Sequence, residues 1–241
     1  MDALSESRHV GDHGDMPSLA RSLVAEALGT AFLLIAIVGS GILGERLAEG
    51  NVALALLANA LATGAALYAL IVWLAPLSGA HFNPLVTLVL AFRGDIAARL
   101  AGFYVPAQLA GAVVGVAIAD AMFDMPVYAL SSHLRSGRSQ WLSEFLVTFG
   151  LIGIVWCCTR LRPSALAGVV AAYIGGGFWF TATDFANPAV ALARALTDTF
   201  SGIRPMDVPG FLVAEILGAL TAVLLFRWLV PNVASSPTAL R

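Results

Sequence analysis

Long apolar runs separated by short polar segments dominate the chain. A helix that crosses a bilayer needs about 20 mostly apolar residues, and six runs approach or reach that length. They are Leu23–Leu43, Val52–Pro76, Leu100–Ala119, Trp141–Thr159, Leu166–Phe180 and Phe211–Phe226. Each run is continuously apolar rather than alternating, which is typical of helices and not of the strands of a membrane barrel. The pattern therefore predicts six transmembrane helices.

Two further apolar stretches are too short to span a bilayer, and each begins with Asn-Pro. One follows the second run and starts at Asn83-Pro84, and the other follows the fifth run and starts at Asn187-Pro188. Asn is a preferred N-cap and Pro a preferred first residue of a helix. Both stretches are therefore predicted to be short helices that begin abruptly at the asparagine.

The two halves of the chain share a pattern of polar residues. Glu26 in the first run and Glu144 in the fourth are each followed four residues later by Thr, while Gln108 and Glu215 hold matching places in the third and sixth runs. Each half contains three spans, an odd number, so the second copy must be inverted across the membrane. We expect an all-α membrane protein with six transmembrane helices plus two re-entrant half-helices, built as an inverted repeat.

This pattern also predicts the domain organisation. We expect one channel domain at 19–231, with repeats at 19–122 and 139–231, a disordered cytoplasmic tail at 1–18 and a C-terminal tail at 232–241. If the N-terminus is cytoplasmic, eight arginines lie on that side and five on the other. This excess favours a multi-pass protein of the plasma membrane with both termini in the cytoplasm.

Composition agrees with a protein embedded in the lipid bilayer. Of the 241 residues, 59% are hydrophobic and 12% are charged, whereas a soluble domain carries about 25% charged residues. The net charge of −2 offers no basic surface for nucleic acid. The two cysteines, Cys157 and Cys158, are adjacent in an apolar run, so no zinc site is expected. No cofactor, bound metal or catalysis is implied, and we expect a protein that is not an enzyme.

An inverted repeat brings the N-terminal ends of the two half-helices together near the midplane. Unpaired backbone is costly in lipid, so such ends are expected only where they meet each other or line a wet cavity. Their positive dipole ends disfavour cations, protons included. Each Asn oxygen can cap its own helix, which leaves the amide N–H groups for a passing solute. We therefore expect a narrow pore with Asn83 and Asn187 at its waist, suited to water or small uncharged solutes.

These motifs resemble the aquaporin, or major intrinsic protein, family. The resemblance rests on Ser78-Gly79-Ala80-His81-Phe82-Asn83-Pro84, on Asn187-Pro188-Ala189, on the pair Glu26 and Glu144 and on Gln108, and it covers about Leu23 to Phe226. The family implies a homotetramer with one pore per subunit and passive, bidirectional flow.

Four polar residues inside apolar runs are expected to be structural, accepting hydrogen bonds from the loops that lead into the half-helices or doing similar work. They are Glu26, Glu144, Gln108 and Glu215. In the third run, Gly111 and Gly115 form a pair of small residues four apart, which is suited to close contact between helices.

The family pattern assigns the outer selectivity filter to Thr63, Gly175, Asp184 and Val190, and the run Gly175-Gly176-Gly177 allows the fifth-run position to shift by one or two residues. In the family an Arg normally follows the second Asn-Pro-Ala, and here that position is Val190. Orthodox water channels have an aromatic residue and a His where this chain has Thr63 and Gly175. These replacements widen the opening, and they resemble a bacterial aquaglyceroporin branch associated with arsenic compounds. We expect arsenite and other metalloid acids, glycerol-like polyols and water to pass. An orthodox water channel and a gradient-coupled secondary transporter are the alternatives.

Three polar residues near the motifs carry further expectations. His81 is expected to line the cytoplasmic half of the pore. Asp184 is either a charged filter residue or a carboxylate held by backbone N–H groups or by Arg194. Arg194 lies one helical turn beyond Val190, so it either restores a positive charge at the outer mouth or is exposed at the surface. Arg135, in the loop between the halves, is expected to be exposed.

Overall fold

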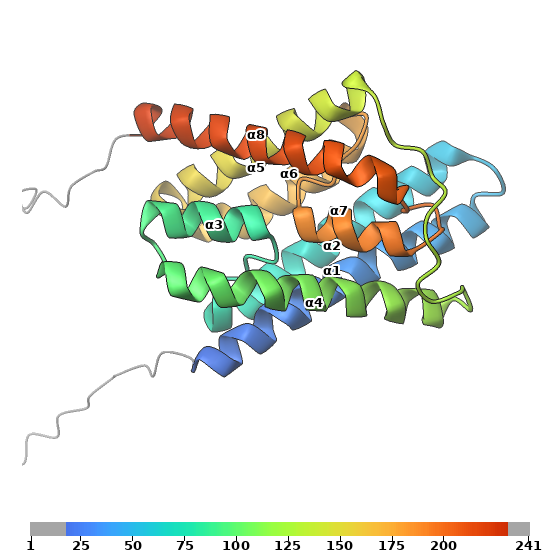
Figure 1. Cartoon of the computed structure of the whole chain (residues 1–241), viewed down its shortest axis with the longest axis horizontal. Coiled ribbons are helices and arrows are strands. Elements are labelled where there is room, and N and C mark those ends of the chain that lie inside the picture. The colour runs from blue at the N-terminus through green and yellow to red at the C-terminus, as the bar shows by residue number, and fades with distance from the viewer. Residues whose placement is uncertain (1–17, 231–241) are drawn as a thin grey trace, which may run out of the picture.

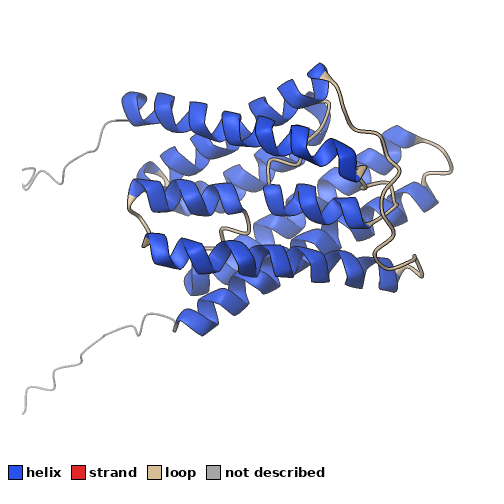
Figure 2. Ribbon diagram, viewed as in Figure 1, coloured by secondary structure: helices blue, strands red, loops and turns tan. Residues whose placement is uncertain are grey.

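The computed structural model describes residues 18–230, so the expected tails at 1–18 and 232–241 fall outside it except for Ser18. The described chain is helical and contains no strand (Figures 1 and 2). Six helices are long: α1 (Leu19–Leu47), α2 (Val52–Ser78), α4 (Ala98–Met122), α5 (Arg138–Leu161), α6 (Leu166–Phe180) and α8 (Val208–Leu229). Two are short: α3 (Pro84–Arg93) and α7 (Pro188–Ala193).

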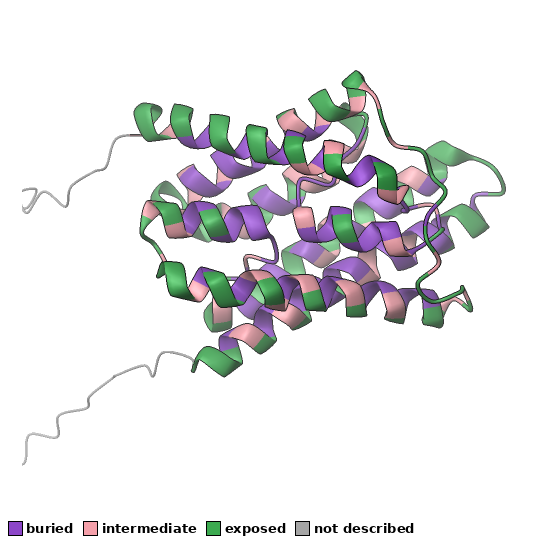
Figure 3. Cartoon of the chain, viewed as in Figure 1, coloured by how far each residue is buried: buried purple, intermediate pink, exposed green. Residues whose placement is uncertain are grey.

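The six predicted spans are confirmed by length and composition. Short 3₁₀ turns extend two of them, so that α6 is part of an apolar segment at Pro163–Phe180 and α8 of one at Pro205–Leu229. Large apolar side chains remain exposed on the long helices, whereas polar residues such as Glu26, Gln108 and Glu144 are buried between them. Figure 3 shows how exposed and buried positions are distributed along the helices. This distribution is the one expected of helices that are surrounded by lipid rather than by water.

Local sequence signals explain where the first half-helix begins and ends. Helix α2 stops at Gly79, whose φ of 90° favours glycine. Helix α3 then begins at Asn83, whose side-chain oxygen accepts a hydrogen bond from the Leu85 backbone N–H, and Pro84 is its first residue. It ends at Gly94, which has a φ of 83°.

Each half of the chain packs in the same way. Helix α1 lies against α2 and α4, helix α5 lies against α6 and α8, and the contact between α2 and α6 joins the halves. Glycines allow equivalent close approaches: a Cβ on Gly111 of α4 would overlap the Ala27 carbonyl of α1, and one on Gly218 of α8 would overlap the Phe145 carbonyl of α5. A Cβ on Gly115 would likewise overlap the Ala31 carbonyl, so the predicted close contact at Gly111 and Gly115 is confirmed.

The two half-helices lie end to end in the middle of the bundle (Figure 1). Helix α3 runs from the junction toward the face where α1 begins and α8 ends, which we call the terminal face. Helix α7 runs from the junction toward the opposite face, which we call the linker face because the linker between the repeats, residues 123–137, crosses it. This arrangement is the predicted pair of re-entrant half-helices.

Candidate functional site

The two Asn-Pro motifs meet through reciprocal hydrogen bonds. The Asn83 side-chain amide donates to the Ala186 carbonyl at 2.7 Å, and the Asn187 amide donates to the Phe82 carbonyl at 2.8 Å. Each asparagine oxygen meanwhile caps its own helix, and Asn187 accepts from the Ala189 N–H at 3.0 Å. An amide group has two N–H donors. Each asparagine therefore keeps one donor beyond the bond that ties it to the other half.

Glu26 holds the loop that leads into α3. Its Oε1 accepts hydrogen bonds from the Ser78 hydroxyl at 2.6 Å and from the His81 backbone N–H at 2.9 Å. Its Oε2 accepts from the Phe82 N–H at 2.8 Å and from the Gln108 amide at 2.7 Å. Glu26 and Gln108 are fully buried. Because the loop's backbone donors would otherwise lack partners in an apolar bundle, this carboxylate fixes the start of α3.

In the second half, two acids share the equivalent work. The Glu144 carboxylate accepts from the Phe185 N–H at 3.1 Å and from the Ala186 N–H at 3.0 Å. The Asn187 N–H donates to Glu215 Oε1 at 3.1 Å. Three consecutive backbone donors before α7 are thus satisfied by side chains of α5 and α8. Both re-entrant loops are held by buried acids from helices of their own half.

A cavity passes the junction of the half-helices. Polar residues that line it are His81, Asn83, Asn187, Thr63, Asp184 and Thr159. Apolar residues from α1, α2, α3, α5 and α6 also line it, as does Val190 of α7. His81 is held in place by a contact of 3.0 Å between its Nδ1 and the Thr87 hydroxyl. A mainly apolar wall with a few polar groups along it is typical of a path for small solutes.

Three of the four residues expected in the outer filter line this cavity, namely Thr63, Asp184 and Val190. Gly175 is not among the lining residues. A Cβ on Gly175 would lie 3.4 Å from the Ala60 carbonyl oxygen and 3.6 Å from the Gly64 Cα, so this glycine faces α2. Ile174 of α6 lines the cavity instead. This glycine serves the contact between α2 and α6, and the α6 residues that line the cavity are Leu166, Val170, Ile174 and Phe178.

Two polar groups near the outer end of the cavity lack internal partners. The Thr63 hydroxyl and both carboxylate oxygens of Asp184 are buried and have no hydrogen-bond partner in the described part of the chain. The expected hydrogen bonds from backbone N–H groups to Asp184 are therefore absent in the described part of the chain. Buried polar atoms are normally hydrogen-bonded, so these three atoms are exceptions among the described residues.

The outer mouth carries two arginines around one aromatic ring. Arg194 is only 5% exposed, so the interpretation that places it at the surface is wrong. Its Nε donates to the Ser201 carbonyl, and its Cζ lies 3.5 Å from the centroid of Phe185. Arg135, expected to be exposed, is partly buried, and its Cζ lies 5.7 Å from the same centroid. Both arginines line a second pocket that shares Asp184 and Phe185 with the central cavity.

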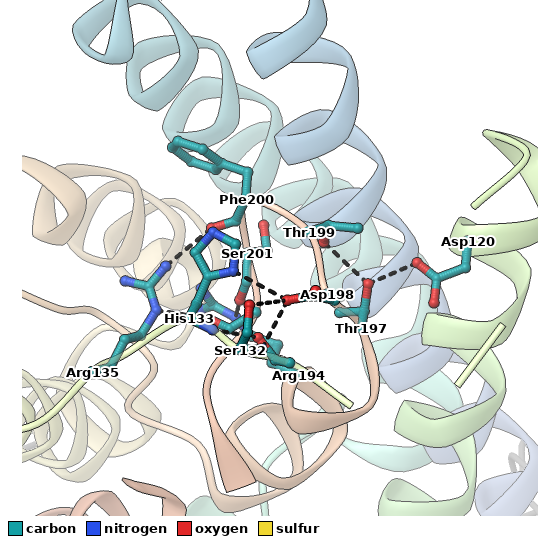
Figure 4. A network of polar contacts seen from close by, with 12 residues as sticks. Asp120, Ser132, His133, Arg135, Arg194, Thr197, Asp198, Thr199, Phe200 and Ser201 are labelled. Atoms are coloured by element: carbon teal, nitrogen blue, oxygen red, sulfur yellow. Dashed lines mark hydrogen bonds and ion pairs between the residues drawn. The ribbon is translucent and has the colours of Figure 1, made fainter. Parts of the chain in front are cut away.

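The linker residue Arg135 is held beside Phe185 at the outer mouth. Arg135 Nε donates to the Gly202 carbonyl at 2.7 Å, and its Nη2 donates to the Phe200 carbonyl at 3.0 Å. The linker is fastened again where Asp198 Oδ1 accepts from the Ser132 N–H at 2.8 Å and from the Ser132 hydroxyl at 2.9 Å (Figure 4). These hydrogen bonds hold the pKa of the Asp198 carboxyl below its ordinary value. Sequence reasoning missed Arg135 because no local pattern relates a linker residue to the segment after α7.

Comparison with known proteins agrees with this geometry. Residues 15–184 match the family described as major intrinsic protein. The chain is 53% identical over 212 residues to "Aquaglyceroporin AqpS" of Rhizobium meliloti (strain 1021), covering 88% of this chain and 91% of that protein. It is 34% identical over 189 residues to human "Aquaporin-5", covering 72% and 69% of the two chains.

A solved structure shows the same fold at low sequence identity. The aquaglyceroporin from Plasmodium falciparum superimposes with a TM-score of 0.68 at 22% identity, covering 87% of this chain and 96% of that one. The fold, the paired Asn-Pro junction and the sequence matches agree, and this chain belongs to the major intrinsic protein family.

Proposed function

We propose that this chain is a passive transmembrane channel for small uncharged solutes. Its permeants are arsenite and other metalloid acids, glycerol-like polyols, and water. The observation that carries the proposal is the pair of asparagines at the junction, because both line the cavity while their oxygens cap the half-helices. The resemblance to a bacterial aquaglyceroporin supports a solute of the glycerol class.

At the waist, selection depends on hydrogen bonding and charge. Asn83 and Asn187 each offer one remaining N–H to a hydroxyl or water oxygen. The N-terminal ends of α3 and α7 both point at this position, and their positive ends raise the energy of a cation there. An uncharged hydroxylated solute satisfies the donors without that electrostatic penalty.

At the outer filter, size selects. Thr63, Asp184 and Val190 set the opening together with an α6 residue, for which the cavity lining favours Ile174 over Gly175. None of these side chains carries the positive charge that normally follows the second Asn-Pro-Ala. We place that charge on Arg194, one turn further out, where it keeps the mouth unfavourable for cations without narrowing the filter. Arsenous acid is neutral near pH 7 and carries several hydroxyl groups, so it resembles glycerol in this respect.

The proposal is tested by stopped-flow measurement of water, glycerol and arsenite permeation in proteoliposomes that contain the full chain. We expect all three to pass faster than through empty liposomes. Val190→Arg should reduce glycerol and arsenite permeation by about tenfold, an added barrier of about 1.4 kcal/mol, and should reduce water permeation less. Val190→Ala, which keeps the opening, is the matched control.

Two results would favour the alternatives. Permeation by water alone would identify an orthodox water channel. Accumulation of solute above equilibrium that an ionophore abolishes would identify a gradient-coupled transporter. We further propose a homotetramer in the plasma membrane with both termini cytoplasmic. The mass of the detergent-solubilised protein and the accessibility of a C-terminal tag in sealed cells test these two statements.

A further inference from the structure

A pocket on the terminal face is lined by three arginines and two aromatic residues. We call it the three-arginine pocket, and its residues are Phe92, Arg93, Trp156, Arg160 and Arg227. They come from the last turns of α3, α5 and α8, whose ends lie on the same side of the bundle (Figure 1). No residue of this pocket belongs to the cavity that passes Asn83 and Asn187.

The floor of the pocket is rigid. Arg93 donates to the Trp156 carbonyl at 2.8 Å and to the Thr159 hydroxyl at 2.6 Å, so its guanidinium is fixed against α5. Two arginines lie close to the Trp156 ring, with the Cζ of Arg93 5.2 Å and that of Arg160 5.9 Å from its centroid. Trp156 is 4% exposed, and its indole N–H is buried without a hydrogen-bond partner in the described part of the chain. The guanidinium groups beside this ring therefore present N–H donors and positive charge in a preformed arrangement.

Guanidinium groups gather in this pocket. Among the described residues, Asp95 is an acid that pairs with Arg93, and its other oxygen lies 3.8 Å from Arg160. Arg227 of α8 adds a third guanidinium group and is exposed. Guanidinium groups in this density favour an oxyanion, phosphate above all.

The side chains around the pocket are suited to a lipid rather than to a soluble ligand. Phe92 is 64% exposed, and Trp228, beside Arg227, is 76% exposed. Leu88 on α3 and Leu224 on α8, each one turn deeper than Phe92 and Trp228, are also exposed. Aromatic side chains near the ends of transmembrane helices mark the headgroup level, and apolar faces below them contact acyl chains. An anion that binds here sits directly above exposed apolar helix faces.

We propose that the three-arginine pocket binds the phosphate group of an anionic phospholipid in the adjacent leaflet. The phosphate contacts Arg160 and Arg227 above the ring of Trp156, and the acyl chains lie along the exposed faces of α3 and α8. Basic pockets between transmembrane helices are suited to such headgroups. The charge of the terminal face agrees with this, because six arginines of the described chain lie at helix ends there: Arg21, Arg93, Arg99, Arg160, Arg162 and Arg227.

The test is lipid binding by native mass spectrometry of the delipidated full-length protein. Dioleoylphosphatidylglycerol, which is anionic, and dioleoylphosphatidylcholine, which is not, are added separately. We expect preferential binding of the anionic lipid. Arg227→Gln and, as a second variant, Arg160→Gln should each weaken that binding about fivefold, as expected for one arginine near a headgroup. Arg21→Gln removes an exposed charge from the same face but outside the pocket, and it should bind as the unaltered protein does.

Several outcomes would overturn the proposal. Equal binding of the two lipids would do so, and so would an equal effect of the Arg21 and Arg227 substitutions. Inorganic phosphate provides the third arm. If millimolar phosphate displaces the lipid and its own binding requires Arg227, the pocket is a site for a free anion and not for a lipid. No transport is measured, so failure here is distinguishable from failure of the proposed channel function.

Discussion

Single buried polar residues decide how the re-entrant loops are held. Glu26 accepts four hydrogen bonds from two loop N–H groups, one hydroxyl and one amide. A carboxylate is suited to this task because it accepts only, with both oxygens. A neutral amide of the same shape would turn one acceptor into a donor that faces other donors.

We therefore predict that Glu26→Gln destabilises the protein. The loss should be about 2 kcal/mol, the scale of hydrogen bonds to a charged group, which corresponds to a lowering of Tm by about 4–8 °C. Thermal unfolding in detergent measures it. Glu45→Gln, at an exposed position of the same helix, is the control and should leave Tm unchanged. Equal Tm values for the two variants would contradict a structural role for the buried carboxylate.

Arg135 gives a second prediction at the scale of a residue. Removing its charge from the outer mouth in Arg135→Ala should raise permeation of small cations such as methylammonium relative to glycerol. Coulomb repulsion of about 1 kcal/mol in a wet cavity corresponds to an increase of about fivefold. Flux in proteoliposomes measures the ratio, and Arg135→Lys should restore most of the exclusion.

The control for Arg135 is Arg204→Ala. Arg204 lies on the same face, is paired with Asp207, and its side chain is 44% exposed. It does not line the outer pocket. If both alanine variants exclude cations as the unaltered protein does, Arg135 has no part in selectivity.

At the scale of helices, glycines set the distance between α1 and α4 and between α5 and α8. The two contacts occupy matching places in the two repeats, at Gly111 and Gly218. Because lipid does not drive helices together as water does, close packing of backbones carries much of the association energy. A Cβ at either glycine would overlap a carbonyl group of the facing helix.

Gly111→Ala and Gly218→Ala are thus each expected to destabilise the bundle by about 1–3 kcal/mol, the usual cost of overpacking. Gly102 of α4 provides the comparison, because a Cβ there meets nothing within 4 Å. Gly102→Ala should be neutral or stabilising, since Ala favours a helix by about 1 kcal/mol over Gly. Thermal unfolding of the three variants in the same detergent decides. The prediction is contradicted if Gly102→Ala loses as much stability as the other two.

At the scale of the whole molecule, the linker ties the two repeats together across one face. It reaches the segment after α7 through Ser132 and Asp198, through Arg135, and through the His133 carbonyl, which accepts from the Arg204 N–H at 2.8 Å. Through these contacts the linker supports the outer mouth of the cavity.

The bond between Ser132 and Asp198 makes this attachment sensitive to acid. The pKa of Asp198 is lowered in the folded protein by the Ser132 hydrogen bonds. The ionised Asp198 carboxylate therefore stabilises the attachment of the linker fully above the ordinary carboxyl pKa of about 4. This stabilisation is lost as the pH falls through the lower pKa of the folded protein. Hydrogen exchange of residues 123–137 should rise at that acidic pH. In Asp198→Asn it should already be raised at pH 7 and lose this dependence on pH. An unaltered acidic response in the variant would exclude Asp198 as the group responsible.

Much of the architecture follows from the sequence alone. Six apolar runs must become helices because lipid offers no partner for backbone groups. Asn83-Pro84 and Asn187-Pro188 fix where the half-helices begin because capping is a local interaction. The odd number of spans in each repeat then requires inversion, so the meeting of the two motifs is already implied by the pattern of the chain.

Which residues form the outer mouth became clear only from the tertiary structure. Gly175 turned out to serve the contact with α2, because the rotation of α6 about its axis depends on packing and not on local sequence. Arg194 is buried against Phe185, and Arg135 reaches the same ring from a linker position about 50 residues before it in the sequence. Helix capping and hydropathy depend on residues that are close together in the sequence. The position of a side chain in a shared cavity instead depends on how distant segments pack, and this packing cannot be inferred from local sequence patterns.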